Sequence, residues 1–228
     1  MTLVEKATQD IRKMIADRKV DENGYLPSEG ELSEQLSVSR MTIREAVRSL
    51  EVRGFVKRVH GKGILVTENS AETLRQTMAD AISMSGCTLL DLIEVRTAVE
   101  AEAAFHAAKR ATEQDLAEML SYIEKMEAAE TMDDKYIEAD LGFHLALVKA
   151  SKNPILLIIE QAYTPLLRDT ITSASQGPEV IERAYHYHRN IYDAIVTKDG
   201  QKAEANMQTH LVVTQSNIKE RYLKEESA

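Results

Sequence analysis

The stretch from Leu26 to Arg53, LPSEGELSEQLSVSRMTIREAVRSLEVR, decides the fold of the first third of the chain. Ser28 is followed by Glu31 at the spacing of a capping box, which predicts the start of a short helix. Ser39 caps a second helix, which runs to the end of the stretch. A tight turn around Val38 joins the two helices. This order is typical of a helix-turn-helix that reads the major groove of DNA.

The second helix is predicted to be amphipathic. One narrow face is apolar and holds Ile43, Ala46, Val47 and Leu50. The opposite side is cationic, with Arg44 and Arg48 at its centre and Arg40 at its edge. We therefore expect the apolar face to pack inward and the arginines to face a partner.

A two-stranded wing is predicted to follow, with strands at 54–59 and 64–66 and a glycine-rich turn between them. From Ser39 to Lys62 the chain has seven Lys and Arg and two acids, although its net charge is −9. A helical hairpin with a solvated charged face would explain the charge alone. The order of helix, turn, helix and wing favours DNA binding.

Composition limits the remaining possibilities. The 228 residues suffice for two domains, and the longest apolar run, Ile155–Ile159, is far shorter than the roughly 18 residues of a membrane span. Cys87 is the one cysteine, which excludes an intrachain disulfide. The N-terminal segment contains acids and does not read as a signal peptide. We expect a cytoplasmic protein that does not contact a membrane.

The predicted fold is mainly α, with two domains. Residues 1–67 form a winged helix-turn-helix, residues 68–74 a polar linker, and residues 75–228 an all-α bundle of six or seven helices. Thr112, with Asp115 three residues later, caps one of these helices. Residues 68–228 contain 16 Lys and Arg against 27 acids, so DNA should contact the N-terminal part.

Asp140, His144, His188 and His210 suggest a binding site in the bundle. Asp140 and His144 are four residues apart, so both project from one helix face, which is otherwise apolar. His188 and His210 also lie on largely apolar helix faces. One carboxylate and three imidazoles suit a divalent metal such as Zn²⁺, Ni²⁺, Mn²⁺ or Fe²⁺. A single inward histidine is more often a hydrogen-bonded core residue, so the spacing leaves both interpretations open.

Arg96 is a further candidate because its predicted helix face is otherwise apolar. A buried guanidinium needs an acceptor. Glu100, one turn away, or another buried acid is one possible acceptor, and the carboxylate of a small effector bound in bidentate fashion is the alternative. Asn206, which shares a helix face with His210, is predicted to add a hydrogen bond to the effector.

The segment from Leu26 to Val66 resembles the DNA-binding domain of the GntR family of bacterial transcription regulators. The resemblance implies that DNA is contacted by Arg40, Thr42, Arg44, His60 and Gly61. We add Ser39, Arg48 and Lys62 to the predicted DNA-binding set because of their side-chain chemistry or their positions. Gly30 stands where the family usually has a basic residue, so we expect one phosphate or base contact fewer.

The helical part, residues 75–228, resembles the FCD effector domain of the FadR-like branch of the same family, which implies that this part binds the effector and forms the dimer. The segments EADLGFH, HRNIYDAI and MQTH, which end at or contain the four candidate ligands, carry this resemblance. It implies a metal held by Asp140, His144, His188 and His210, with Zn²⁺ or Ni²⁺ first and Mn²⁺ or Fe²⁺ as alternatives. It also implies that Arg96 faces the effector cavity.

These observations predict an effector-responsive transcription regulator, a repressor, that binds a pseudo-palindromic operator as a homodimer. The effector is predicted to be a small organic acid at the metal site. The alternative is a metal-dependent hydrolase or lyase fused to a DNA-binding module, because a metal with an open position can activate water. A bundle that serves only as a dimerisation scaffold also remains open.

Overall fold

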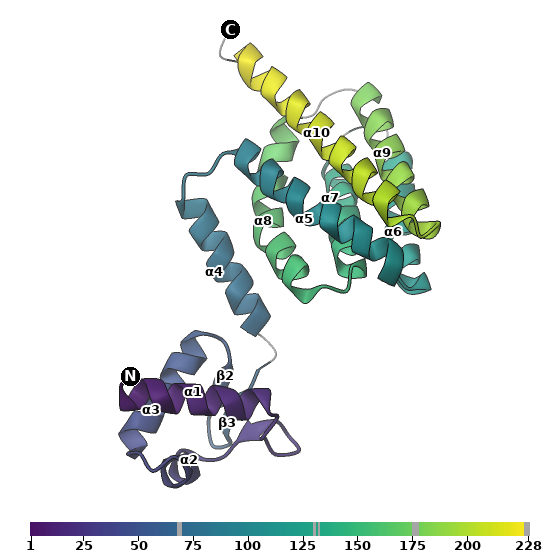
Figure 1. Cartoon of the computed structure of the whole chain (residues 1–228). Coiled ribbons are helices and arrows are strands. Elements are labelled where there is room, and N and C mark those ends of the chain that lie inside the picture. Colours follow the sequence, from purple (N-terminus) through teal and green to yellow (C-terminus); the bar gives the residue numbers. More distant parts are fainter. Residues whose placement is uncertain (68–69, 130, 132, 175–177, 226–228) are drawn as a thin grey trace. The chain divides into compact units, whose positions relative to one another are not determined.

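The computed structural model describes residues 1–67, 70–129, 131, 133–174 and 178–225. These residues form two compact units, Met1–Thr77 and Met78–Ala228, and Figure 1 labels their elements. The elements, in order, are α1 (Leu3–Ala16), β1 (Tyr25–Leu26), α2 (Glu29–Gln35), α3 (Arg40–Val52), β2 (Val56–Val59), β3 (Gly63–Val66), α4 (Ser70–Met84), α5 (Leu89–Arg110), α6 (Glu113–Glu127), α7 (Asp134–Ala150), α8 (Pro154–Ala174), α9 (Pro178–Val196) and α10 (Gly200–Glu225).

The predicted helix-turn-helix is confirmed as α2 and α3. Ser28 Oγ accepts a hydrogen bond from the Glu31 amide at 3.3 Å, and the Glu31 carboxylate accepts one from the Ser28 amide at 2.8 Å. Ser39 Oγ accepts from the Thr42 amide at 3.1 Å and so caps α3. These side chains satisfy amide donors that the first turn of a helix leaves without a partner.

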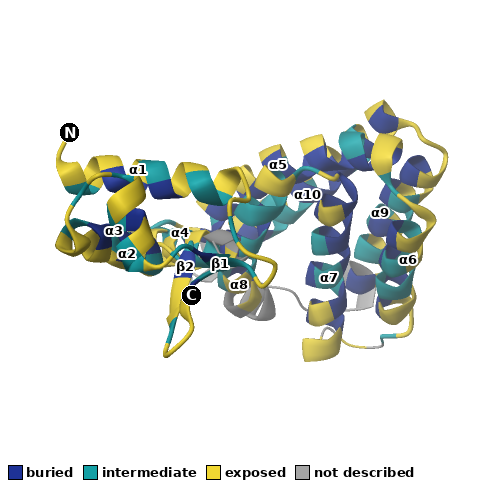
Figure 2. Cartoon of the chain, turned by 90° about the horizontal axis from the view of Figure 1, so that it is seen from below, coloured by how far each residue is buried: buried dark blue, intermediate teal, exposed yellow. Residues whose placement is uncertain are grey.

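The predicted apolar face of α3 forms the core of the N-terminal unit. Ile43, Ala46, Val47 and Leu50 are completely buried. They pack with Leu32 of α2 and with residues of α1, and Figure 2 shows such buried stripes in dark blue. The arginines of α3 consequently lie on its exposed side.

The wing has three strands rather than the predicted two. β3 lies between β1 and β2 and is antiparallel to both. The added strand, β1, has only two residues, which pair as Tyr25 with Leu65 and Leu26 with Ile64. Two residues are too few for an alternating sequence pattern, so only the tertiary pairing with β3 reveals this strand.

Helix α4 occupies most of the segment that the sequence predicts as a polar linker. It begins at Ser70, whereas residues 68 and 69 lie outside the described residues. Its mixed composition, SAETLRQTMADAISM, has only a weakly amphipathic pattern, and this is why the start of the helix is hard to place from sequence.

The C-terminal unit is the predicted all-α bundle. Helix α5 packs most extensively against α10 and also contacts α7, α8 and α9. It can approach its neighbours closely because much of its buried surface is alanine: Ala101, Ala103, Ala104, Ala107 and Ala108. None of the helices that the structure describes combines the length and the apolar character needed to cross a lipid bilayer.

A buried carboxylate fixes the start of α6 to the end of α7. Asp115 accepts hydrogen bonds from the Thr112 amide at 2.8 Å and hydroxyl at 2.6 Å, and it lies 2.6 Å from Lys152 Nζ. Burial by itself would raise the pKa of Asp115, but the hydrogen bonds from Lys152 and Thr112 outweigh it and hold the pKa at about 2. The carboxylate therefore stays ionised and stabilises the folded chain.

We expect Asp115→Asn to lower the free energy of unfolding by about 1–2 kcal/mol at pH 7, because a cap and a charge-assisted hydrogen bond are lost. The folded pKa of about 2 lies below the usual value of 3.8, so the difference between wild type and variant should be complete above about pH 5 and shrink as the pH falls toward 2. Urea unfolding at several pH values measures it.

The matched control is Asp91→Asn. Asp91 closes an equivalent capping box with Thr88 on α5, is exposed, and has no lysine in its described contacts. Equal losses in the two variants would show that Lys152 adds nothing to the stability of the α6–α7 contact.

Candidate functional site

Asp140, His144, His188 and His210 lie together in the core of the helical unit. One ligand atom from each of these residues lies within 4.8 Å of those from the others. His188 Nε2 is 3.1 Å from His144 Nε2 and 3.2 Å from Asp140 Oδ1. The three histidines are buried, and the side chain of Asp140 is 13% exposed. The structure thus brings together all four residues that the sequence singled out.

Three helices position these side chains. Helix α7 supplies the aspartate and one histidine from a single face, because the two are four residues apart. Helices α9 and α10 are joined by a connection of three residues, 197–199, so His188 and His210 come to face each other with ring centroids 4.6 Å apart. Phe143 packs its ring edge-on against His188, with ring centroids 4.9 Å apart, and adds apolar surface beside the cluster.

Glu100 of α5 joins the cluster to Arg96. Its carboxylate accepts a hydrogen bond from Arg96 Nε at 2.5 Å and also contacts His144 Nδ1. This contact directs the other ring nitrogen of His144, Nε2, toward Asp140 and His188. A carboxylate behind a histidine is the usual arrangement around a metal-ligating imidazole, where it fixes the tautomer and the ring orientation.

The guanidinium of Arg96 is almost completely buried, with 2% of the residue exposed. Burial would lower the pKa of Arg96, but the charges of Glu100, Asp140 and Glu160 outweigh it and raise the pKa, so the group is cationic. Glu100 satisfies Nε, whereas Nη2 has no hydrogen-bond partner among the described residues. Arg96 therefore retains one free buried donor beside the cluster.

The protonation states suit metal ligation. Burial lowers the pKa of His144 and of His210 well below the usual histidine value, so both rings are neutral and keep a lone pair. Burial alone would raise the pKa of Asp140, but its contact with His188 and the charge of Arg96 outweigh burial and hold that pKa well below the usual range. Neutral imidazoles and an ionised carboxylate are the forms that bind metal.

The charge balance of this region also fits a divalent cation. One guanidinium, Arg96, faces three carboxyl groups, those of Glu100, Asp140 and Glu160. Burial raises the pKa of Glu100 and of Glu160, and a neighbouring acid, Asp140 for Glu100 and Glu100 for Glu160, raises it further, so this poorly solvated core holds an excess of acidic groups over the one guanidinium. A dication among the imidazoles would balance this excess, so the residues present fit a metal.

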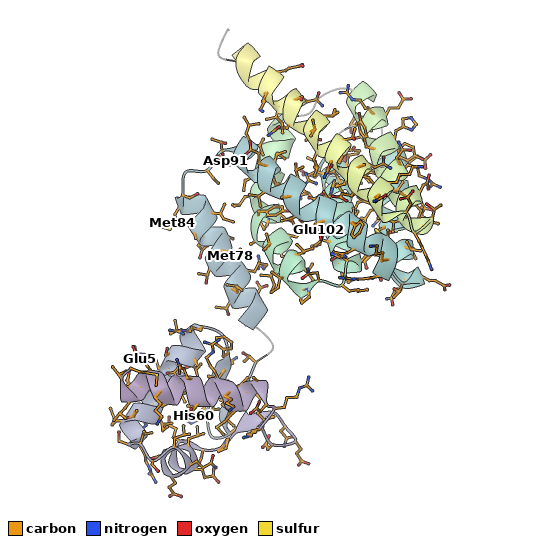
Figure 3. All side chains as sticks on the ribbon, in the orientation of Figure 1. Glu5, His60, Met78, Met84, Asp91 and Glu102 are labelled. Atoms are coloured by element: carbon orange, nitrogen blue, oxygen red, sulfur yellow. The ribbon has the colours of Figure 1, made fainter. Side chains whose placement is uncertain are left out.

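Other polar residues of the unit lie apart from this cluster. Asn206 is on α10 one turn before His210, and its amide donates to the Asn190 carbonyl of α9 at 2.9 Å. The predicted contact of Asn206 with an effector stays a prediction. His106 of α5 pairs with Glu102, the residue labelled in Figure 3, at 2.9 Å and is not part of the cluster.

The predicted DNA-binding residues belong to two elements of the N-terminal unit, α3 with its N-cap and the turn between β2 and β3. Arg40, Arg44 and Arg48 are exposed on α3, while Ser39 and Thr42 lie at its N-terminal end. His60, labelled in Figure 3, Gly61 and Lys62 are exposed in the turn between β2 and β3. Gly61 has φ 71°, a conformation that favours glycine, and the space around its Cα is open enough for a phosphate to approach.

Sequence reasoning missed an acidic residue beside Arg44. The Glu29 carboxylate of α2 accepts a hydrogen bond from Arg44 Nε at 2.7 Å and lies 3.5 Å from Arg58 of β2. Arg40 extends toward Gly30, with Nη2 3.4 Å from the position of an added Cβ. A guanidinium thus lies beside the position where the family usually has a basic residue.

Sequence reasoning also missed the contact of Glu100 with the cluster, since it suggested this residue only as a partner of Arg96. The i,i+4 spacing of these two residues was the available signal. Its contact with His144 joins residues 44 positions apart and could not be read from spacing.

Comparisons with known proteins agree with this arrangement. Residues 3–66 match the model of the bacterial regulatory proteins of the gntR family, and residues 91–212 match the FCD domain. The chain is 30% identical over 203 residues to the HTH-type transcriptional regulator LutR of Bacillus subtilis, covering 87% of this chain and 93% of the relative. It is 29% identical over 231 residues to the putative L-lactate dehydrogenase operon regulatory protein of Escherichia coli, covering 95% and 86%.

A solved structure shows the same architecture. Streptococcus agalactiae GntR superposes with a TM-score of 0.69 at 27% identity, covering 93% of this chain and 99% of that one. The matched domains and relatives are transcription regulators rather than enzymes. The chain therefore belongs to the GntR family of transcription regulators, as a member that carries an FCD domain.

Proposed function

We propose that this protein is a repressor that binds a pseudo-palindromic operator as a homodimer and releases it when a small organic acid binds in the FCD domain. The observation that carries the proposal is the cluster of Asp140, His144, His188 and His210, with ligand atoms within 4.8 Å of one another beside a buried arginine.

The chemistry of the cluster indicates the class of effector. A divalent ion, Zn²⁺ or Ni²⁺ first and Mn²⁺ or Fe²⁺ as alternatives, would supply coordination for carboxylate and hydroxyl oxygens. Arg96 offers a free Nη2 donor for the charge of an acid. The E. coli relative is named for an L-lactate dehydrogenase operon, which supports a 2-hydroxy acid as the effector of this chain.

The N-terminal unit supports the operator part of the proposal. Its exposed arginines on α3 suit guanine edges in the major groove, and the wing tip suits the phosphate backbone. One recognition helix covers a short half-site, so we infer a homodimer on a two-fold symmetric operator. A protein that works on DNA in this way acts in the cytoplasm.

The effector regulates DNA binding only if it binds the two states of the dimer with different affinity. Asp140 and His144 lie on one helix, whereas His188 and His210 belong to the α9–α10 hairpin. An acid held by ligands from both parts would favour one arrangement of these helices. We propose that this arrangement is the one with low operator affinity.

We expect the purified full-length chain to bind about one Zn²⁺ or Ni²⁺ per chain, and Asp140→Ala/His188→Ala to bind none. Glu100→Gln should weaken metal binding about 10- to 100-fold, because the support behind His144 is lost while all four ligands remain. Competition with a chromophoric chelator measures these affinities.

The matched control is His106→Ala/His186→Ala, which removes two histidines outside the cluster and should leave metal binding unchanged. Metal that persists in Asp140→Ala/His188→Ala would place the ion elsewhere and overturn the proposed site.

The central test is release of operator DNA by a panel of acids: L-lactate, glycolate and gluconate. Operator fragments are first selected from randomised DNA with the wild-type protein. We expect one acid to reduce operator affinity about 5- to 150-fold, the usual range of allosteric coupling, and only in the metal-loaded protein. Fluorescence anisotropy of labelled operator measures the change.

Arg44→Ala is the control for the DNA-binding surface. It should lose at least about tenfold in operator affinity while keeping its metal, because one bidentate base contact disappears. No response to any acid would contradict the effector proposal. Consumption of the acid, detected by mass spectrometry, would instead favour the metal-dependent enzyme.

A further inference from the structure

The buried hydroxyl of Tyr136 has no role in the fold or in the metal cluster described above. The residue is 2% exposed, and its hydroxyl has no hydrogen-bond partner among the described residues. A buried polar group without a partner costs free energy, so such groups in native proteins call for an explanation.

Tyr163 in the same bundle shows how a buried phenol is usually satisfied. It lies on α8, is 1% exposed, and donates its hydroxyl hydrogen to the Glu160 carboxylate. The two tyrosines therefore differ in hydrogen bonding although both are buried. The missing hydrogen bond of the Tyr136 hydroxyl therefore calls for an explanation at its own position on α7.

That place is beside the proposed effector site. Tyr136 precedes Asp140 by one helical turn on the same face of α7. Burial, followed by the charge of Asp140, raises the pKa of Tyr136, so the hydroxyl keeps its proton and acts as a donor. The charge of Asp140 also acts on Arg96, whose Nη2 is a second unpartnered donor of this region; His188 Nδ1, on the far side of its ring from Asp140, is a further buried nitrogen without a partner among the described residues.

Two buried donors in the field of one carboxylate point to a shared acceptor. An acid with several oxygens could accept from both, because a guanidinium takes its charge and a phenol takes one further oxygen at a fixed position. A purely structural role for the hydroxyl would require a partner in the fold, and none is present among the residues that the structure describes.

We propose that the hydroxyl of Tyr136 is a recognition group of the effector site and donates a hydrogen bond to an oxygen of the bound organic acid. This inference rests on the proposed function, since it needs an acid that binds beside Asp140 and Arg96. It adds a residue that the sequence did not single out, and it makes the number and position of the acid's oxygens a basis of selection.

The test is Tyr136→Phe, which removes only the hydroxyl, with Tyr163→Phe as the matched control. Titration calorimetry with L-lactate, or with whichever panel acid releases the operator, is carried out on the metal-loaded full-length proteins. We expect Tyr136→Phe to bind the acid about tenfold more weakly, the usual effect of losing one hydrogen bond to a charged group. Thermal unfolding without the acid should show an unchanged or higher midpoint, because an unpaired buried hydroxyl has been removed.

Tyr163→Phe should show the opposite pattern, with a lower midpoint in the absence of acid, because Glu160 loses the phenol donor and keeps, among the described residues, only the hydrogen bond from Thr164 Oγ1. Wild-type affinity in Tyr136→Phe, in a protein whose wild type binds the acid, would overturn the inference and leave the proposed function intact. A lower acid-free midpoint in Tyr136→Phe would also overturn it, since the hydroxyl would then have a structural partner. A wild type that binds no acid of the panel would overturn the proposed function and this inference together.

Discussion

The helical unit depends most on the contacts that the Glu100 carboxylate makes with Arg96 and His144. The carboxylate is fully buried and meets Arg96 on one side and His144 on the other. A buried ion pair gains little over an apolar contact of equal size, but removal of one partner leaves an uncompensated charge and is strongly destabilising. The contact therefore fixes α5 against α7 in one register. Because His144 is part of it, the same register sets the direction of a cluster imidazole.

The N-terminal unit has a comparable contact between an acid and basic residues at its surface. Several arginines must stay close together without a buried counter-charge, and Glu29 supplies an acid that both Arg44 and Arg58 can reach. This acid links α2, α3 and the wing, so three elements share one electrostatic contact. Its negative charge also partly offsets the positive charge of these arginines and restrains the direction of the Arg44 side chain.

The parts of the molecule that the sequence predicted well are those set by neighbouring residues. Ser28, Ser39 and Thr112 cap helices through partners three residues away, and the inward face of α3 follows from helical periodicity. Asp140 and His144 share a face for the same reason. The contacts of Glu100 with His144 and of Glu29 with Arg44 span 44 and 15 residues, so no local pattern encodes them. The unpartnered hydroxyl of Tyr136 is also invisible in sequence, because only packing shows which polar atoms lack a partner.

The division of the chain into two compact units has a consequence for how such a protein diversifies. Every residue of the histidine cluster, together with Arg96 and Glu100, comes from Met78–Ala228, whereas the reading helix and the wing come from Met1–Thr77. Among the described residues, the core cluster of the N-terminal unit contains residues of that unit alone, and the two core clusters of the C-terminal unit contain residues of that unit alone. Substitutions on the exposed face of α3 or in the wing turn therefore leave the core of the helical unit unchanged, and substitutions in the histidine cluster leave the core of the N-terminal unit unchanged. The preference for a DNA sequence and the preference for an effector can therefore evolve separately, because each is encoded in its own part of the chain.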